Sequence, residues 1–212
     1  MSKIGVVRFP GSNCDEDVCN FVRAKGFTAE YLWHLDQFTI ADYEGLILPG
    51  GFSYGDYLRS GALSARSPVM KSVREFVSRG GPVLGICNGF QILAEAHLLP
   101  GALVQNEKRR FIDDWVELEF LGKAKFWAAE HPNRMIRLPI AHGDGRFYAD
   151  ADSLKKIEDQ GQVWLKYRGN PNGSLRDIAG VLNEQRNVAG LMPHPERAIF
   201  DWMGGVDGWS FL

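Results

Sequence analysis

The sequence predicts an α/β fold: a flavodoxin-like, mostly parallel sheet with helices on both faces and antiparallel strands added in the C-terminal half. Over residues 1–100, short apolar strand patterns alternate with amphipathic helix patterns, which is typical of parallel βαβ units. After residue 110, strand patterns follow one another with turn sequences between them, which favours antiparallel pairing. Because no segment has the composition of a linker, we expect residues 1–212 to form a single domain.

The first half is expected to supply the parallel strands. Asn13 and Glu16 fit a capping box at the start of the first helix, and Ser67 followed by a proline fits the start of the second. Apolar residues in both helices recur three or four positions apart. The expected order is strand 3–9, helix 13–26, strand 28–33, strand 45–48, helix 67–80, strand 82–86 and helix 90–97.

The second half is richer in strand patterns than in helix patterns. Turn sequences at 170–173 and 183–187 separate some of these strands, and His131 is placed in a turn before a proline. The tail from Asp201 has no assignable pattern. The expected strands are 115–121, 135–141, 162–167, 178–182 and 188–192.

Residues 85–89, GICNG, have the spacing of a nucleophile elbow, in which a buried strand turns sharply into a helix. Glycines two positions before and after Cys87 would relieve crowding around its strained backbone. The helix N-terminus that follows would favour thiolate over thiol. An inert buried cysteine on a glycine-rich turn explains this local pattern equally well. We expect the other cysteines, Cys14 and Cys19, to be packing residues.

A base for such a thiol is available in the sequence PHPE. Prolines flank His194, so the backbone there is expected to be extended, and His194 and Glu196 would point the same way. The imidazole would take the thiol proton, and the carboxylate would fix the tautomer. A surface His-Glu pair at a turn is the alternative. Strand 188–192 favours the catalytic interpretation, because it delivers the pair to the end of the sheet.

Acyl transfer also needs hydrogen-bond donors for the developing oxyanion. The N–H of Asn88 follows the nucleophile, and the glycine-rich loop 50–52 is the expected source of a second donor. A simple glycine turn is the alternative for this loop. His142, in a loop after a strand, fits a substrate loop and a structural turn equally well.

Composition narrows the class of protein. The 212 residues are 45% hydrophobic and 24% charged, with a formal net charge of −2, so nothing favours a nucleic-acid or membrane partner. Three cysteines and no signal-peptide pattern indicate reduced thiols in a cytoplasm. The scattered histidines and the lack of C-x-x-C predict no metal site, and the lack of a Walker A pattern predicts no nucleotide site.

Together these motifs resemble the class I glutamine amidotransferases, and most closely their branch of PurQ-type glutaminase subunits of phosphoribosylformylglycinamidine synthase. The resemblance covers nearly the whole chain, except that residues 101–115 lack the Ser-Gly pair common near Lys108 and Arg109, which affects expected partner contacts. The motifs that carry it are FPGSNCDED, LPGGFSYGDYLRSGA, PVLGICNGFQILAEA, IAHGDGRF, NPNGS and GLMPHPER.

The resemblance implies roles for individual residues. Cys87 would be the nucleophile, with His194 and Glu196 completing a catalytic triad. The oxyanion hole would be formed by Gly51 and Asn88, and substrate glutamine would be bound by Gln91, Phe52 and His142.

The resemblance also implies an activity and partners. Glutamine would be hydrolysed to glutamate and ammonia through a Cys87 thioester. The ammonia would go to a separate synthetase subunit in de novo purine biosynthesis, which would hold ATP and magnesium and work with a small accessory subunit. This chain would hold no cofactor. A different Cys-His hydrolase on a similar sheet and a non-catalytic binding module remain the two alternatives.

Overall fold

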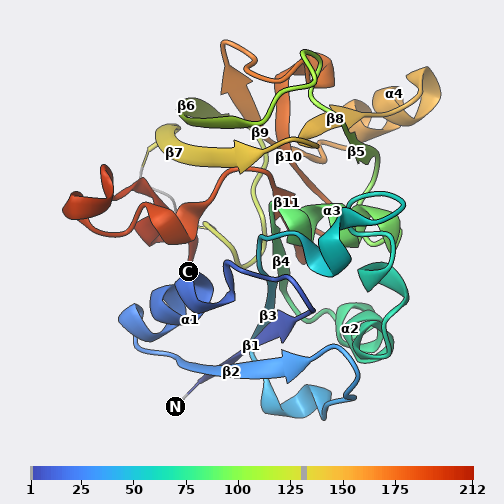
Figure 1. Ribbon diagram of the computed structural model, residues 1–212, viewed down its shortest axis with the longest axis vertical. Helices are drawn as coiled ribbons and strands as arrows, with labels where there is room; N and C mark the ends of the chain where they lie inside the picture. Colours follow the sequence, from blue (N-terminus) through green and yellow to red (C-terminus); the bar gives the residue numbers. More distant parts are fainter. Residues whose placement is uncertain (1, 130–132) are drawn as a thin grey trace.

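The computed structural model describes residues 2–129 and 133–212 and shows a nine-stranded mixed sheet between helices (Figure 1). The strand order is β2-β1-β3-β4-β11-β10-β9-β6-β7, and β5 and β8 pair in a separate small sheet. The strands are β1 (Lys3–Arg8), β2 (Thr28–Trp33), β3 (Gly45–Leu48), β4 (Val83–Ile86), β5 (Ala102–Val104), β6 (Ile112–Phe120), β7 (Met135–His142), β8 (Arg146–Tyr148), β9 (Val163–Arg168), β10 (Ile178–Leu182) and β11 (Val188–Leu191). The α-helices are α1 (Asp15–Ala24), α2 (Val69–Ser78), α3 (Asn88–Glu95) and α4 (Ala151–Asp159).

The first five strands of that order, β2 to β11, pair in parallel throughout. Helix α1 lies on one side of them, and α2 and α3 lie on the other (Figure 1). Because both faces are covered, β3, β4 and β11 are buried along their whole length and have continuous apolar sequences. The predicted flavodoxin-like order is confirmed, and it brings the loops after β1, β3, β4 and β11 to one edge of the sheet.

The remaining strands, from β10 to β7, pair antiparallel, as the C-terminal sequence predicts. Strand β6 begins earlier than expected, because Ile112 already pairs with His142 at the end of β7. Helix α4 was not predicted, although Asp150 caps it by accepting a hydrogen bond from the Ser153 N–H at 2.9 Å. The small β5–β8 sheet was also missed, because three-residue strands leave no periodic pattern.

Several expected helix ends are wrong. Helix α1 has no capping box at Asn13; it begins at Asp15, whose carboxylate accepts the Glu16 N–H at 2.9 Å. Helix α2 likewise has no side-chain cap from Ser67. Helix α3 begins at Asn88, earlier than expected, because the turn from β4 is completed within the single residue Cys87. The turn expected at His131 lies outside the described residues.

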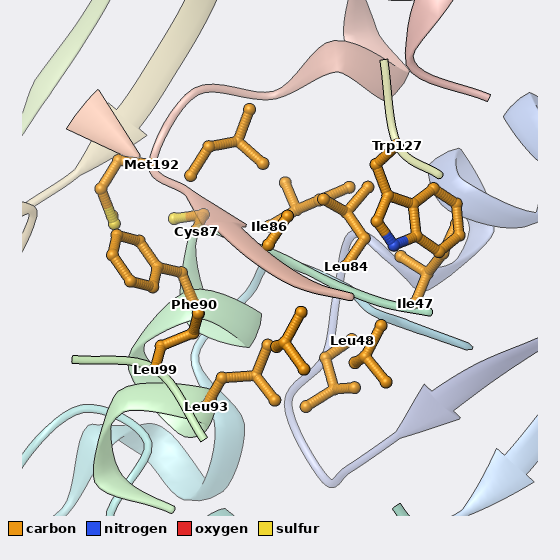
Figure 2. Packing of buried hydrophobic residues seen from close by; sticks show 14 of the residues in the cluster. Ile47, Leu48, Leu84, Ile86, Cys87, Phe90, Leu93, Leu99, Trp127 and Met192 are labelled. Atoms are coloured by element: carbon orange, nitrogen blue, oxygen red, sulfur yellow. The ribbon is translucent and has the colours of Figure 1, made fainter. Parts of the chain in front are cut away.

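The buried hydrophobic side chains pack as a connected core around the parallel strands (Figure 2). Ile47 and Leu84 lie near Trp127 on one side of β4, whereas Phe90 and Met192 lie on the side of Cys87 (Figure 2). The unassigned tail also contributes, since Phe211 is fully buried. Among the described residues, no helix has the length and apolar character needed to cross a membrane.

The contact of α3 with β3 predicts an unusual response to mutation. A methyl group at Gly89 would overlap the backbone carbonyl oxygen of Leu48. Gly→Ala within a helix normally stabilises it by about 1 kcal/mol, but we expect Gly89→Ala to destabilise this protein by about 2 kcal/mol or more, because the helix must move off the strand.

Urea denaturation measures this difference, with Gly143→Ala as the matched control. A Cβ at Gly143 has only Phe111 nearby, at 3.9 Å, so its effect should stay within about 0.5 kcal/mol. Equal stabilities of the two variants would contradict the close approach of α3 to β3.

Candidate active site

Cys87 occupies the junction between β4 and α3 in a strained conformation, with φ 49° and ψ −105°. This turn leaves no room for side chains at the flanking glycines. A Cβ at Gly85 would lie 2.6 Å from the Leu93 side chain, and one at Gly89 would overlap Leu48. The geometry is therefore that of a nucleophile elbow, which places the thiol at the carboxyl edge of the sheet.

His194 and Glu196 follow β11, the strand beside β4, and reach the same edge. The His194 Nδ1 and Glu196 Oε1 atoms are 2.7 Å apart, so the expected hydrogen bond is present. The backbone differs from the expectation: it is not extended throughout, because Pro195 begins a short 3-10 turn that carries Glu196. Both residues are only 1% exposed, so the pair is not a surface pair.

The thiol and the imidazole converge over Gly50. A Cβ at Gly50 would lie 2.7 Å from His194 Cε1 and 3.4 Å from Cys87 Cβ, so any larger residue would press on both. The Cys87 thiol also donates to the Ala141 carbonyl at 3.8 Å, and the backbone N–H of His194 donates to the Pro139 carbonyl at 2.8 Å. Strand β7 thus makes a hydrogen bond with each of the two residues.

The charge state of His194 follows from its neighbours. Burial alone would lower the pKa of His194, but the Glu196 carboxylate and the Cys87 thiolate outweigh it and raise this pKa to about 10. The imidazole is therefore protonated at neutral pH when it faces the thiolate. A protonated imidazole held between a carboxylate and a cysteine side chain is placed to give its proton to a leaving group.

The backbone N–H groups of Asn88 and Gly51, the two expected oxyanion donors, have no acceptor within the described residues. Asn88 directly follows Cys87, and Gly51 directly follows Gly50, which borders the Cys87 side chain. Gly51 has φ +136°, and a Cβ there would lie 2.6 Å from the Gly11 carbonyl oxygen and 2.7 Å from the Asn13 nitrogen. Only glycine fits this position, so the loop after β3 is held firmly against the loop after β1.

Gln91 lies on α3 one turn beyond Cys87, and its side chain is 5% exposed. Its Nε2 donates to the Asp144 carbonyl at 2.7 Å, and its Oε1 accepts from the Asn88 side chain at 2.8 Å. Asn88 Nδ2 also approaches Asp56 Oδ1 at 3.3 Å. Burial and the nearby Asp144 charge raise the pKa of Asp56 to about 6. The two acidic residues of this network were not singled out from the sequence.

His142 is buried and lies at the end of β7. Its Nδ1 is 3.1 Å from Asn106 Oδ1, and burial, with the nearby His194 charge, lowers the pKa of His142 to about 4. Asn106, which the sequence did not single out, also accepts from the Gly145 N–H at 3.1 Å and so orders the loop after β7. Phe52 is 46% exposed and packs near Phe111 at the surface.

Cys14 is buried, as expected for a packing residue, but it borders the His194–Glu196 pair. Its Sγ accepts a hydrogen bond from Arg197 at 3.2 Å, across 183 positions of sequence. Its Sγ and ligand atoms of His194 and Glu196 all lie within 4.8 Å of one another. Cys19, on α1, is fully buried.

Comparisons with known proteins place these features in a family context. Residues 1–206 match a family model described as a CobB/CobQ-like glutamine amidotransferase domain. A relative from Nostoc sp. strain PCC 7120, the phosphoribosylformylglycinamidine synthase subunit PurQ, is 55% identical over 209 residues, 97% of this chain and 93% of the relative. The subunit of the same name from Prochlorococcus marinus strain MIT 9312 is 51% identical over 212 residues, with the same two coverages.

Solved structures agree with the sequence relatives. A chain in the structure of PurLQS from Thermotoga maritima is 45% identical with a TM-score of 0.90, over 99% of this chain and 95% of that chain. A glutamine amidotransferase from the same organism is 19% identical with a TM-score of 0.60, over 93% of this chain and 77% of that chain, and shares the fold.

The charge on His194 predicts how alkylation of Cys87 depends on pH. Because the raised pKa keeps His194 positively charged through neutral pH, alkylation of Cys87 should fall less steeply between about pH 8 and pH 6 than alkylation of a free thiol. A free thiol, with a pKa of about 8.5, loses thiolate roughly tenfold per unit over that range. His194→Ala should therefore slow alkylation most strongly at the lower pH.

Peptide mass spectrometry after brief treatment with iodoacetamide measures alkylation at Cys87 separately from the other two thiols. Glu196→Gln should give an intermediate profile, since it removes one source of the raised His194 pKa. Identical pH profiles for the wild type and His194→Ala would contradict the Cys87–His194 pair.

Proposed function

The chain belongs to the CobB/CobQ-like glutamine amidotransferase family, as a PurQ-type subunit of phosphoribosylformylglycinamidine synthase, and we propose that Cys87, His194 and Glu196 hydrolyse its glutamine. The observation that carries this proposal is the convergence of a strained elbow cysteine with a buried, carboxylate-paired histidine over Gly50. The subunit thereby supplies nitrogen to purine biosynthesis.

The chemistry follows from the positions of these groups. The Cys87 thiolate attacks the side-chain amide carbon of glutamine, and the negative charge that develops on the amide oxygen is held by the free N–H groups of Gly51 and Asn88. The His194 imidazolium gives its proton to the departing ammonia, which leaves a γ-glutamyl thioester. His194 then takes a proton from water as the water attacks the thioester, so glutamate leaves and the Cys87 thiolate and His194 imidazolium are restored.

Substrate recognition is proposed for the network on the α3 side of the thiol. Gln91 and Asn88 are held by hydrogen bonds, which presents their amides in one orientation. The carboxyl groups of Asp56 and Asp144 lie close enough to influence each other, so they give this side an acidic character suited to the α-ammonium group of an amino acid. We assign His142 to the opposite wall and Phe52 to the rim.

Ammonia must reach a second active site. We propose that the partner is the synthetase subunit, that a small accessory subunit joins the complex, and that ATP and magnesium bind to the synthetase. The similar chain from T. maritima belongs to a structure of PurLQS, which supports this proposal. Exposed apolar side chains follow the loop after β3: Tyr57 is 75% exposed and Leu58 is 89% exposed. They suit a docking face at the carboxyl edge of the sheet. We further propose that the protein is cytoplasmic and that it consists of a single domain.

Removal of the nucleophile separates hydrolysis from synthesis. Cys87→Ala should lower glutamine-dependent synthesis in the assembled enzyme by about a thousandfold or more, because no thioester can form. Synthesis from added ammonium salts should persist, since ammonia is the delivered species. Amidine formation is measured with each nitrogen source.

The matched control is Cys19→Ser, a buried thiol on α1 that plays no part in the proposed chemistry. It should retain glutamine-dependent synthesis after allowance for any loss of stability. Near-normal glutaminase activity in Cys87→Ala would rule out the elbow cysteine as the nucleophile.

Glutamine is wasted if it is hydrolysed when no synthetase substrate is ready to accept the ammonia. We therefore expect the isolated chain to be a weak glutaminase. Docking of the loaded synthetase should raise the rate on the order of tenfold or more, if the loaded partner binds the active state of this subunit more tightly than its resting state. Glutamate release is followed with and without the partner and its substrates. Full activity of the isolated chain would contradict this coupling.

A further inference from the structure

The side chain of Asn88 joins the helix that begins at the nucleophile to the loop after β3. Asn88 is fully buried, although asparagine is mostly a surface residue. Its Oδ1 accepts the backbone N–H of Ser53 at 3.2 Å, and its Nδ2 donates to Gln91 Oε1 at 2.8 Å and to Asp56 Oδ1 at 3.3 Å. Both Nδ2 hydrogens are therefore engaged within the protein, and neither remains for a ligand.

The loop after β3 depends on contacts of this kind. Tyr54, Asp56 and Leu58 have left-handed backbone conformations, with φ 53°, 55° and 70°. Residues with a side chain rarely adopt this region, and they keep it only where the surrounding structure fixes it. A lost contact would therefore let this part of the loop relax.

The backbone N–H groups of the loop are held from two sides. Those of Phe52 and Tyr54 donate to two carbonyls of the loop after β1, at 2.9 Å and 2.7 Å. The N–H of Ser53, which lies between them in the sequence, donates to Asn88. The N–H of Gly51, two residues before Ser53, has no acceptor among the described residues and is available to a substrate oxygen.

We propose that the Asn88 side chain is a positioning residue for the oxyanion hole: by binding the Ser53 N–H, it keeps the Gly51 N–H where the amide oxygen of glutamine gains its charge. Asn88 then serves the site twice, since its own backbone N–H is the other donor. Oxyanion donors act because they are already in place when the charge develops, so a displaced Gly51 slows the reaction. This inference rests on the function proposed above and assigns a further residue to the same site.

Asn88→Leu removes all three side-chain hydrogen bonds and nearly preserves the volume. In the assembled enzyme, kcat of glutaminase should fall about tenfold or more and KM should change less than about threefold, because displaced donors weaken the transition state more than substrate binding. Alkylation of Cys87 by iodoacetamide should keep its wild-type rate, since that reaction develops no oxyanion. A wild-type kcat, or an equal loss in both reactions, would overturn the proposal.

The matched control is Asn187→Leu. Asn187 is also a buried asparagine, 4% exposed, and its Nδ2 donates to the carbonyls of Val77 and Gly81 at 3.1 Å and 2.9 Å. It precedes β11 and so lies at the opposite edge of the sheet from Cys87. This variant should lose stability but keep the kcat of the folded protein. An equal fall of kcat in both variants would trace the effect to stability and overturn the proposal.

A measurement on the wild-type protein covers the case in which Asn88→Leu fails to fold. Amide hydrogen exchange, followed for single residues by NMR and corrected for intrinsic rates, should be about tenfold or more slower at Ser53 than at Gly51, because only the Ser53 N–H has an acceptor. Equal exchange at the two amides would overturn the proposal.

The outcomes separate this inference from the proposed function. Absence of glutamate release by the assembled wild-type enzyme would refute both together. Turnover that needs Cys87 but not the Asn88 side chain would refute only the positioning role and leave the proposed function standing.

Discussion

The left-handed turn at Cys87 is the constraint on which the rest of the structure depends. A residue at φ 49° with a side chain is tolerated only where its neighbours leave room, and Gly85 and Gly89 provide that room against Leu93 and Leu48. The turn aims the thiol over the sheet edge and begins α3 at once. Because β3 and β11 flank β4 in parallel, the loops after these two strands must meet the thiol from both sides.

Burial then decides how the site behaves. His194 and Glu196 are nearly inaccessible, so their 2.7 Å hydrogen bond lies in a medium where charge interactions are strong. Desolvation opposes the imidazolium, yet the two adjacent negative groups outweigh it. A Cβ at Gly50 would lie 2.7 Å from His194 Cε1 and 3.1 Å from Cys14 Sγ, so only glycine lets the imidazole and the two cysteines pack this closely.

The sequence predicted those parts of the structure that depend on local rules. The G-x-C-x-G spacing indicated the elbow, and strands such as β10 were found at their expected bounds because turns frame a buried apolar run. Contacts between distant segments were not accessible in this way. Cys14 was assigned to packing because nothing local brings it to Arg197, and Asp56 and Asp144 meet only when two loops fold over α3. The turn at Cys87 also displaced the expected start of α3, since a single strained residue replaced a longer loop.

The central claim is that Cys87 is the one thiol that attacks the amide of glutamine. Treatment of the native protein with a chloroketone analogue of glutamine, followed by peptide mass spectrometry, tests it most directly. We expect a single modification, on Cys87, that glutamine prevents and that His194→Ala slows. Modification of Cys14 or Cys19 instead, or no protection of Cys87 by glutamine, would contradict the claim.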